Sequence, residues 1–210
     1  MEQKTWGFAD TVESVVKTQD NGTLIAAVAV LHIPDGALVV DTTYGKGLFW
    51  TQYRPDNLVM HDLHTVDGVD FRNLPEGDGS VDVVVFDPPY MPSGGKETTI
   101  LEMRDRYGIS RNDGSGNRNT VADVAALYVG GIAEAYRVLK PEGRLLVKTM
   151  DFVYGGQYRT MRHHVVTTAI DVGFTQIDEF IHHSGVGPQP GGRVQRTSRR
   201  AHSFLCVFAK

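Results

Sequence analysis

A four-residue segment, Asp87-Pro88-Pro89-Tyr90, combines residue types that suit chemistry on a planar amine. Pro88 biases the preceding residue toward an extended backbone, and neither proline has an N–H, so the segment offers mainly hydrogen-bond acceptors. An amine attached to an aromatic ring is a poor nucleophile because its lone pair is delocalised into the ring. If the Asp87 carboxylate and the Pro88 carbonyl each accept an amine hydrogen, the lone pair can face an electrophile while the Tyr90 ring stacks on the substrate.

This segment directly follows an apolar, β-branched run at residues 81–86, which is typical of a buried strand. A similar run at residues 37–41 ends in Asp41 and leads into a glycine-bearing turn at residues 42–47. In open α/β sheets, ligands bind beyond the carboxyl ends of the strands. We therefore expect the two loops to meet at one edge of a sheet.

The remainder of the chain alternates predicted strands with predicted helices, which favours a mainly parallel sheet covered on both faces. Strands are expected at residues 37–41, 58–62, 81–86, 144–148, 174–183 and 201–209. Helices are expected at residues 22–32, from Leu48 onward, at 121–139 and near 157–172. The last two strands follow one another without a helix and would form an antiparallel pair at one side of the sheet.

The composition is that of one globular α/β domain over residues 1–210, with a single cysteine and a net charge of −4. One cysteine cannot form an intrachain disulfide, and no apolar h-region follows the N-terminal charges, so we expect a cytoplasmic protein. No stretch approaches the roughly 18 apolar residues that a membrane span requires. The acidic balance argues against a protein that coats nucleic acid non-specifically, so any such contact must be local.

Two loops rich in glycine and polar residues, at about 91–120 and 184–198, far exceed the usual connection of about 4–6 residues, and we expect them to be mobile inserts. Arginines gather in both loops. Such runs form either a solvated surface or a set of phosphate contacts. The candidate nucleic-acid-binding residues are Arg104, Arg106, Tyr107, Arg111, Arg118, Arg193, Arg196 and Arg199.

These motifs resemble those of the class I S-adenosylmethionine-dependent amino-methyltransferases, the family that includes the DNA adenine-N6 and cytosine-N4 methylases. Asp-Pro-Pro-Tyr is that family's catalytic motif, and residues 87–90 match it without departure. The resemblance implies a Rossmann-like class I methyltransferase fold: a seven-stranded, mainly parallel sheet with an antiparallel C-terminal strand and helices on both faces. We expect no separate target-recognition domain in residues 1–210, which would be a departure from the DNA methylases.

The resemblance also implies how S-adenosylmethionine would be bound as cofactor. The turn after Asp41 is similar to the family's cofactor loop, and its position before the catalytic loop excludes the permuted members. Asp62 resembles the acid that binds the cofactor ribose, and Asp70 with Phe71 resembles the pair that contacts the adenine. The candidate cofactor-binding residues are Asp41, Thr42, Thr43, Gly45, Gly47, Asp62, Asp70 and Phe71.

Together, these expectations predict the transfer of a methyl group to an exocyclic amine of a nucleobase. Adenine-N6 in DNA is favoured, because the family's cytosine-N4 members more often carry Ser where this chain has Asp87. A base in duplex DNA must then be flipped out of the stack. The alternatives are a cytosine-N4 DNA methyltransferase, a guanine-N2 RNA methyltransferase, and a non-catalytic binding subunit, although such subunits usually lose the tetrapeptide. A homodimer is compatible with the sequence.

Other polar residues give weaker signals. His163-His164 and His182-His183 are adjacent pairs that point apart, and no cluster of cysteines or carboxylates accompanies them, so we expect no metal site. Residues 148–151, Lys-Thr-Met-Asp, follow a predicted strand and so either line the site or serve the fold.

Overall fold

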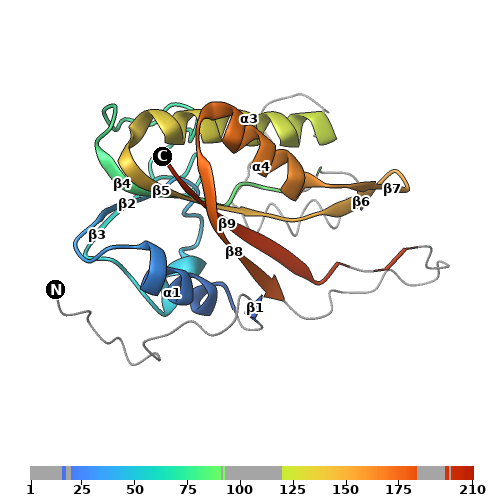
Figure 1. Cartoon of the computed structure of the whole chain (residues 1–210), viewed down its shortest axis with the longest axis horizontal. Helices are drawn as coiled ribbons and strands as arrows, with labels where there is room; N and C mark the ends of the chain where they lie inside the picture. The colour runs from blue at the N-terminus through green and yellow to red at the C-terminus, as the bar shows by residue number, and fades with distance from the viewer. Residues whose placement is uncertain (1–15, 18–19, 91, 93–119, 184–196, 199) are drawn as a thin grey trace.

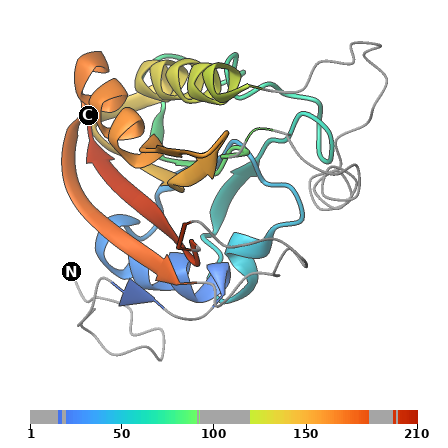
Figure 2. The same cartoon turned by 90° about the vertical axis from the view of Figure 1, so that its right-hand side faces the viewer.

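The computed structural model describes residues 16–17, 20–90, 92, 120–183, 197–198 and 200–210, and these form a seven-stranded sheet with helices on both faces (Figures 1 and 2). The strand order is β1-β8-β9-β5-β4-β2-β3. The strands are β1 (Val16–Lys17), β2 (Leu38–Asp41), β3 (Asn57–Met60), β4 (Val81–Phe86), β5 (Leu139–Thr149), β8 (Thr175–His183) and β9 (His202–Ala209).

Every paired neighbour in this sheet is parallel except β9, which runs antiparallel to both β5 and β8 within the described chain. The predicted mainly parallel sheet with an antiparallel last strand is therefore confirmed. The seventh strand is β1, a two-residue edge strand beside β8 that the sequence pattern did not locate.

Alternating side chains of the central strand β4 separate two cores. Val84 and Phe86 pack beneath α3 (Val121–Val138) and α4 (Met161–Val172), whereas Val83 and Val85 pack against α1 (Asn21–His32) and the 3-10 turn η1 (Leu48–Thr51) on the opposite face. All four side chains are essentially inaccessible to solvent. A strand buried on both faces carries an unbroken apolar run, which explains why residues 81–86 lack polar alternation apart from Asp82.

Helix termini are set by local hydrogen bonds. The Asp20 carboxylate accepts a bond from the Thr23 N–H (2.9 Å) and caps α1. Thr120 and Asp123 form a reciprocal capping box at the start of α3. The expected helices at 22–32 and 121–139 are confirmed. No helix in the described part of the chain combines the length and apolar character needed to cross a membrane.

One expectation about secondary structure is wrong, and another holds only in part. The helix expected from Leu48 is only η1, because Pro55 follows closely and disfavours a helical conformation at Arg54. The helix expected near 157–172 begins only at Met161, and the preceding residues form a hairpin of β6 (Phe152–Tyr154) and β7 (Gln157–Arg159). Gly155 and Gly156 both have positive φ, as a two-residue hairpin turn requires.

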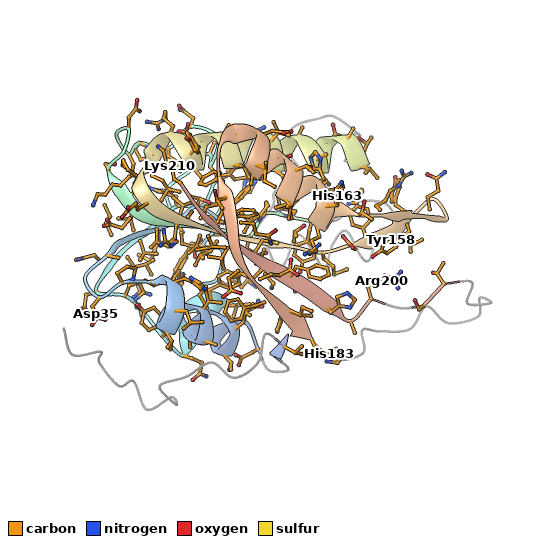
Figure 3. The ribbon with its side chains drawn as sticks, viewed as in Figure 1. Asp35, Tyr158, His163, His183, Arg200 and Lys210 are labelled. Atoms are coloured by element: carbon orange, nitrogen blue, oxygen red, sulfur yellow. The ribbon has the colours of Figure 1, made fainter. Side chains whose placement is uncertain are left out.

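The β6–β7 hairpin extends from the carboxyl end of β5 and is tied to the segment that enters β9 (Figures 1 and 3). The Tyr158 hydroxyl donates to the Asp151 carboxylate (2.7 Å), and the Arg200 guanidinium lies over the Tyr158 ring, 4.6 Å from its centroid. The long loops expected at 91–120 and 184–198 lie almost entirely outside the described residues, so their mobility stays a prediction.

Neighbouring glycines on α3 offer a test of the packing beneath this helix. A Cβ on Gly131 would lie 2.3 Å from Phe86 Cζ, inside the buried core, so Gly131→Ala must push α3 off the sheet. We expect it to lower the free energy of unfolding by about 1–3 kcal/mol, the usual cost of overpacking. Chemical denaturation measures this change.

Gly130→Ala is the matched control for that substitution. The three atoms nearest to its Cβ would all belong to the flexible Arg72 side chain, with Cγ at 3.0 Å and Cδ at 3.1 Å, while the alanine gains up to about 1 kcal/mol of helix propensity. We expect this variant to be as stable as the wild type or more so. Equal effects of the two substitutions would contradict the close packing of Gly131 on Phe86.

Candidate active site

The two loops singled out in the sequence are joined by one threonine. Because β2 and β4 are parallel neighbours, their carboxyl ends lie side by side. The Asp87 N–H donates to Thr43 Oγ1 (2.7 Å), and the Thr43 N–H donates to Asp41 Oδ1 (3.0 Å). Thr42 donates to the Val85 carbonyl from both its N–H (3.0 Å) and its hydroxyl (3.1 Å). The expectation that both loops meet at one edge of the sheet is confirmed.

Asp41 is a buried carboxylate whose two oxygens shape the loop. Besides the Thr43 N–H, it accepts a bond from Trp50 Nε1 (2.7 Å) in η1. Burial raises the pKa of Asp41 to about 7 against the opposing effect of these two donors, and the nearby charges of Asp87 and Asp62 add to the rise. With both oxygens used internally, Asp41 fixes the shape of the loop.

The same loop is tied on its other side to the segment after β3. The Gly45 N–H donates to Asp62 Oδ2 (3.0 Å), and the Thr65 hydroxyl donates to the Gly45 carbonyl (3.1 Å). Asp62 Oδ1 accepts from the N–H groups of His64 and Thr65 (both 2.9 Å). The structure thus brings Asp62 next to Gly45, as expected for residues of one binding site.

Two glycines in this loop adopt the left-handed conformation, for different reasons. A Cβ on Gly47 (φ 68°) would lie 2.5 Å from the Tyr44 hydroxyl oxygen, so Gly47 allows the Tyr44 ring to fold over the backbone. A Cβ on Gly45 (φ 54°) would meet only the Thr43 carbonyl at 3.9 Å. The backbone at Gly45 is therefore open to a closely approaching ligand.

The two carboxylate oxygens of Asp87 have different surroundings. Oδ1 is buried and accepts no hydrogen bond from the described residues, whereas Oδ2 lies 4.0 Å from the Lys148 ammonium. Burial raises the pKa of Asp87, and the positive charges of Lys148 and His182 act against this rise. Oδ1 is therefore an acceptor whose hydrogen-bonding capacity is unused within the described residues.

The residues that follow Asp87, and residues 70–71 in the segment after β3, also lie near the site. Pro88 is buried and Tyr90 is partly buried against the core beneath α3. Phe71 packs on Phe86, with ring centroids 4.9 Å apart. Asp70 is paired with its near neighbour Arg72, whose Nη2 lies 2.6 Å from Oδ2. Phe71 is thus set beneath the carboxyl edge of β4, while Asp70 has an ionic partner of its own.

A buried histidine that the sequence reasoning did not single out organises the same segment. His61, directly after β3, places Nδ1 2.6 Å from Asp67 Oδ2 and Nε2 2.8 Å from Glu76 Oε1. Burial alone would favour the neutral ring, but the hydrogen bonds and charges of Glu76 and Asp67 outweigh it and raise the pKa of His61. An imidazolium donates from both nitrogens, which is the form that these two carboxylates require.

Other candidate residues are placed as follows. Lys148 and His182 belong to the electrostatic surroundings of Asp87, although the sequence left their roles open. Among the described residues, no three His, Cys, Asp or Glu side chains are grouped to hold a metal ion. The candidates Arg104, Arg106, Tyr107, Arg111, Arg118, Arg193, Arg196 and Arg199 lie outside the described residues.

No family model and no curated protein sequence matches this chain, but many solved structures resemble it. TrmN from Thermus thermophilus has a TM-score of 0.51 at 16% identity, over 90% of this chain and 48% of its own. A 1,6-didemethyltoxoflavin-N1-methyltransferase from Burkholderia thailandensis, with 1,6-didemethyltoxoflavin and S-adenosylhomocysteine bound, has a TM-score of 0.50 at 13% identity, over 90% and 78%. A putative DNA modification methylase, also from Thermus thermophilus, has a TM-score of 0.43 at 18% identity, over 68% and 52%.

This chain spans about half the length of TrmN and of the putative DNA modification methylase. The similarity in structure, at identities of 16% and 13% for the two better superpositions, concerns the fold. Together with the strand order, it shows that the chain has the Rossmann-like fold of the class I methyltransferases.

His61, held between the Asp67 and Glu76 carboxylates, makes the free energy of unfolding depend on pH. Because the pKa of His61 in the folded protein is raised above the ordinary 6.5, its interactions with the two carboxylates stabilise the fold fully below about pH 6.5. This stabilisation is lost as the pH rises through the pKa of the folded state. We expect the free energy of unfolding, measured with urea between pH 5.5 and 9, to fall with rising pH in the wild type.

Asp41 also has a raised pKa, so its contribution to the free energy of unfolding falls with rising pH in the same range. Because both proteins contain Asp41, comparing the wild type with His61→Gln isolates the contribution of His61. The decline should be smaller in His61→Gln and unchanged in His163→Gln, since His163 is exposed on α4. An equally steep decline in wild type and His61→Gln would show that the imidazolium is not held by its two carboxylates.

Proposed function

We propose that this protein transfers a methyl group from S-adenosylmethionine to an exocyclic amine of a nucleobase, with adenine-N6 in DNA as the favoured target. The observation that carries the proposal is the buried Asp87 Oδ1, which has no hydrogen-bond partner among the described residues, at the carboxyl edge of a methyltransferase fold. A fold hosts many reactions, so the reaction has to be argued from the site. The target base and the type of nucleic acid belong to the proposal.

The residues of the Asp87 loop suit an amine acceptor. Oδ1 accepts one amine hydrogen and the Pro88 carbonyl accepts the other, which turns the nitrogen lone pair away from the plane of the base. As the lone pair forms the new C–N bond, the C–S electron pair leaves with sulfur, and the nitrogen becomes cationic. The Asp87 carboxylate stabilises that charge before the extra proton departs to solvent. Tyr90 stacks on the base.

The loop after β2 suits the cofactor. Gly45 leaves the backbone open to the cofactor, and Asp62 lies next to it. Thr42, Thr43 and Gly47 hold the shape of this loop. Bound S-adenosylmethionine supplies a methyl group on a sulfonium, which is a strong electrophile. We propose that Phe71 packs against the adenine ring of the cofactor, with Asp70 beside it.

A nucleic-acid substrate is supported by the local arginines of a chain that is acidic overall. We propose that Arg104, Arg106, Arg111, Arg118, Arg193, Arg196 and Arg199, with Tyr107, hold the phosphates and the flipped-out base. Parallel assays with labelled cofactor and with DNA, RNA and protein as acceptors test the substrate class. Product analysis then separates adenine-N6 from cytosine-N4 and guanine-N2.

Asp87→Asn tests the proposed reaction directly. The amide keeps the size of the side chain but removes the charge that stabilises the cationic amine, so kcat should fall by about 10²–10³ while cofactor affinity stays nearly unchanged. Methyl transfer from labelled S-adenosylmethionine and calorimetry measure the two quantities. Asp82→Asn, at the other end of β4, serves as the control and should keep its activity. Activity of Asp87→Asn above a tenth of wild type would rule out the proposed role.

A pair of glycines on either side of β2 tests the cofactor site. Gly45 and Gly36 both have positive φ, and a Cβ meets no close neighbour at either position, so valine strains both backbones alike. We expect Gly45→Val to abolish binding of S-adenosylmethionine and S-adenosylhomocysteine, whereas Gly36→Val, before β2, binds both normally. Calorimetry distinguishes the variants. Normal affinity in Gly45→Val would move the cofactor away from this loop.

A further inference from the structure

A buried lysine ends the strand beside the Asp87 loop. Lys148 lies near the carboxyl end of β5, and its side chain is only 4% exposed. Its ammonium donates to Asn21 Oδ1 (2.6 Å) at the start of α1 and lies 5.4 Å from the centroid of the Phe49 ring. Lysines are almost never this deeply buried unless they are paired. Among the described residues, the nearest carboxylate oxygen to this ammonium is Asp87 Oδ2, at 4.0 Å.

Strand register produces this juxtaposition. β4 and β5 pair in parallel, with Val85 opposite Leu146 and Phe86 opposite Val147, so the next residues along are Asp87 and Lys148. A distance of 4.0 Å is longer than a direct hydrogen bond but well within the range of a strong charge interaction. Lys148 therefore supplies positive charge to the Asp87 carboxylate without occupying Oδ1.

Several charged groups act on Asp87 from the surrounding elements. Lys148 on β5 and His182 on β8 favour its ionised form, whereas burial disfavours it. The Asp41 carboxylate on β2 also interacts with it and adds negative charge to the same region. Burial raises the pKa of Tyr128 on α3, and the charge of Asp87 adds to this rise. The Tyr128 hydroxyl donates to the Lys148 carbonyl (3.1 Å). A nearby cation favours the charged form of a carboxylate in such surroundings.

We propose that Lys148 is a positioning residue for methyl transfer: its buried ammonium, held by Asn21, keeps Asp87 ionised and engages only Oδ2, leaving Oδ1 to accept the substrate amine hydrogen. The inference deepens the proposed function and rests on it. A protonated Asp87 would present a donor or a neutral acceptor to the amine and could not stabilise the cationic nitrogen. Lys148 thus acts through Asp87 and need not touch the substrate.

The structure offers a matched control on the same two strands. At the opposite end of β4 and β5, the Lys140 ammonium lies 2.7 Å from Asp82 Oδ1. Lys148→Met and Lys140→Met each remove one lysine charge beside an aspartate on neighbouring strands, and only the first is at the proposed site. Lys148→Arg restores the charge in a larger group. Asn21→Asp keeps Lys148 but gives its ammonium a competing carboxylate.

Two measurements on these variants test the proposal. Carbon-13 NMR titration of the Asp87 carboxyl, assigned by its loss in Asp87→Asn, should show a higher pKa in Lys148→Met and in Asn21→Asp. The pKa should be close to that of the wild type in Lys148→Arg and Lys140→Met. The acid limb of the pH profile of kcat/KM should move the same way, so that Lys148→Met loses at least about tenfold more activity at the acidic end than at the alkaline end.

The outcomes separate this inference from the proposed function. An unchanged pKa of Asp87 in both Lys148→Met and Asn21→Asp overturns the role of Lys148, as does an equal loss of activity at every pH. If Lys148→Met does not fold, Asn21→Asp decides the matter, since an acidic residue in the first turn of a helix is favourable. Absence of methyl transfer by the wild type contradicts the proposed function, while the NMR titration still decides whether Lys148 controls the charge of Asp87.

Discussion

The hydrogen bond from the Asp87 N–H to Thr43 Oγ1 is the contact on which the geometry of the candidate site depends. It fixes the loop after β4 to the loop after β2. The Thr43 N–H is in turn held by the buried Asp41 carboxylate, which also holds Trp50. Displacement of any member of this chain would move the proposed acceptor of the substrate amine relative to the glycine backbone proposed for the cofactor. A reaction between two bound molecules is sensitive to such displacements of about 1 Å.

Electrostatics impose a second constraint, since carboxylates crowd the carboxyl edge of the sheet. Asp41 and Asp87 interact with each other, and burial disfavours the charge of both. Asp41 is compensated by donors from Trp50 and Thr43. Asp87 instead has a cation at some distance from one of its oxygens. Leaving a buried acceptor unsatisfied costs free energy of folding, and a catalytic role is one of the reasons for which such groups occur in native proteins.

The sequence sufficed to predict the parts of the structure that depend on local patterns. The apolar run at 81–86 identified β4, and parallel-sheet geometry then placed the loops containing Asp41 and Asp87 at one edge. The β6–β7 hairpin was missed although Gly155-Gly156 between two short β-prone runs is a signal for it.

The contacts across the sheet could not be predicted, because they depend on register. The approach of Lys148 to Asp87 follows from the pairing of β4 with β5, and a shift of one residue would reverse the face on which each side chain lies. The two hydrogen bonds to His61 require the chain to bring Asp67 and Glu76 to the same side chain through turns that have no regular secondary structure. The arginines assigned to phosphate contacts fall outside the described residues and remain a prediction.

The antiparallel strand β9 has a consequence for the order in which the molecule can be assembled. It is the last strand along the sequence, yet it lies between β5 and β8 and pairs with both. During synthesis, the half of the sheet that contains β5, β4, β2 and β3 cannot be joined to β8 until residues 202–209 have left the ribosome. Until then β5 and β8 each present an unpaired edge, which other chains can bind. The nascent protein therefore depends on β9 for protection of these two edges against aggregation.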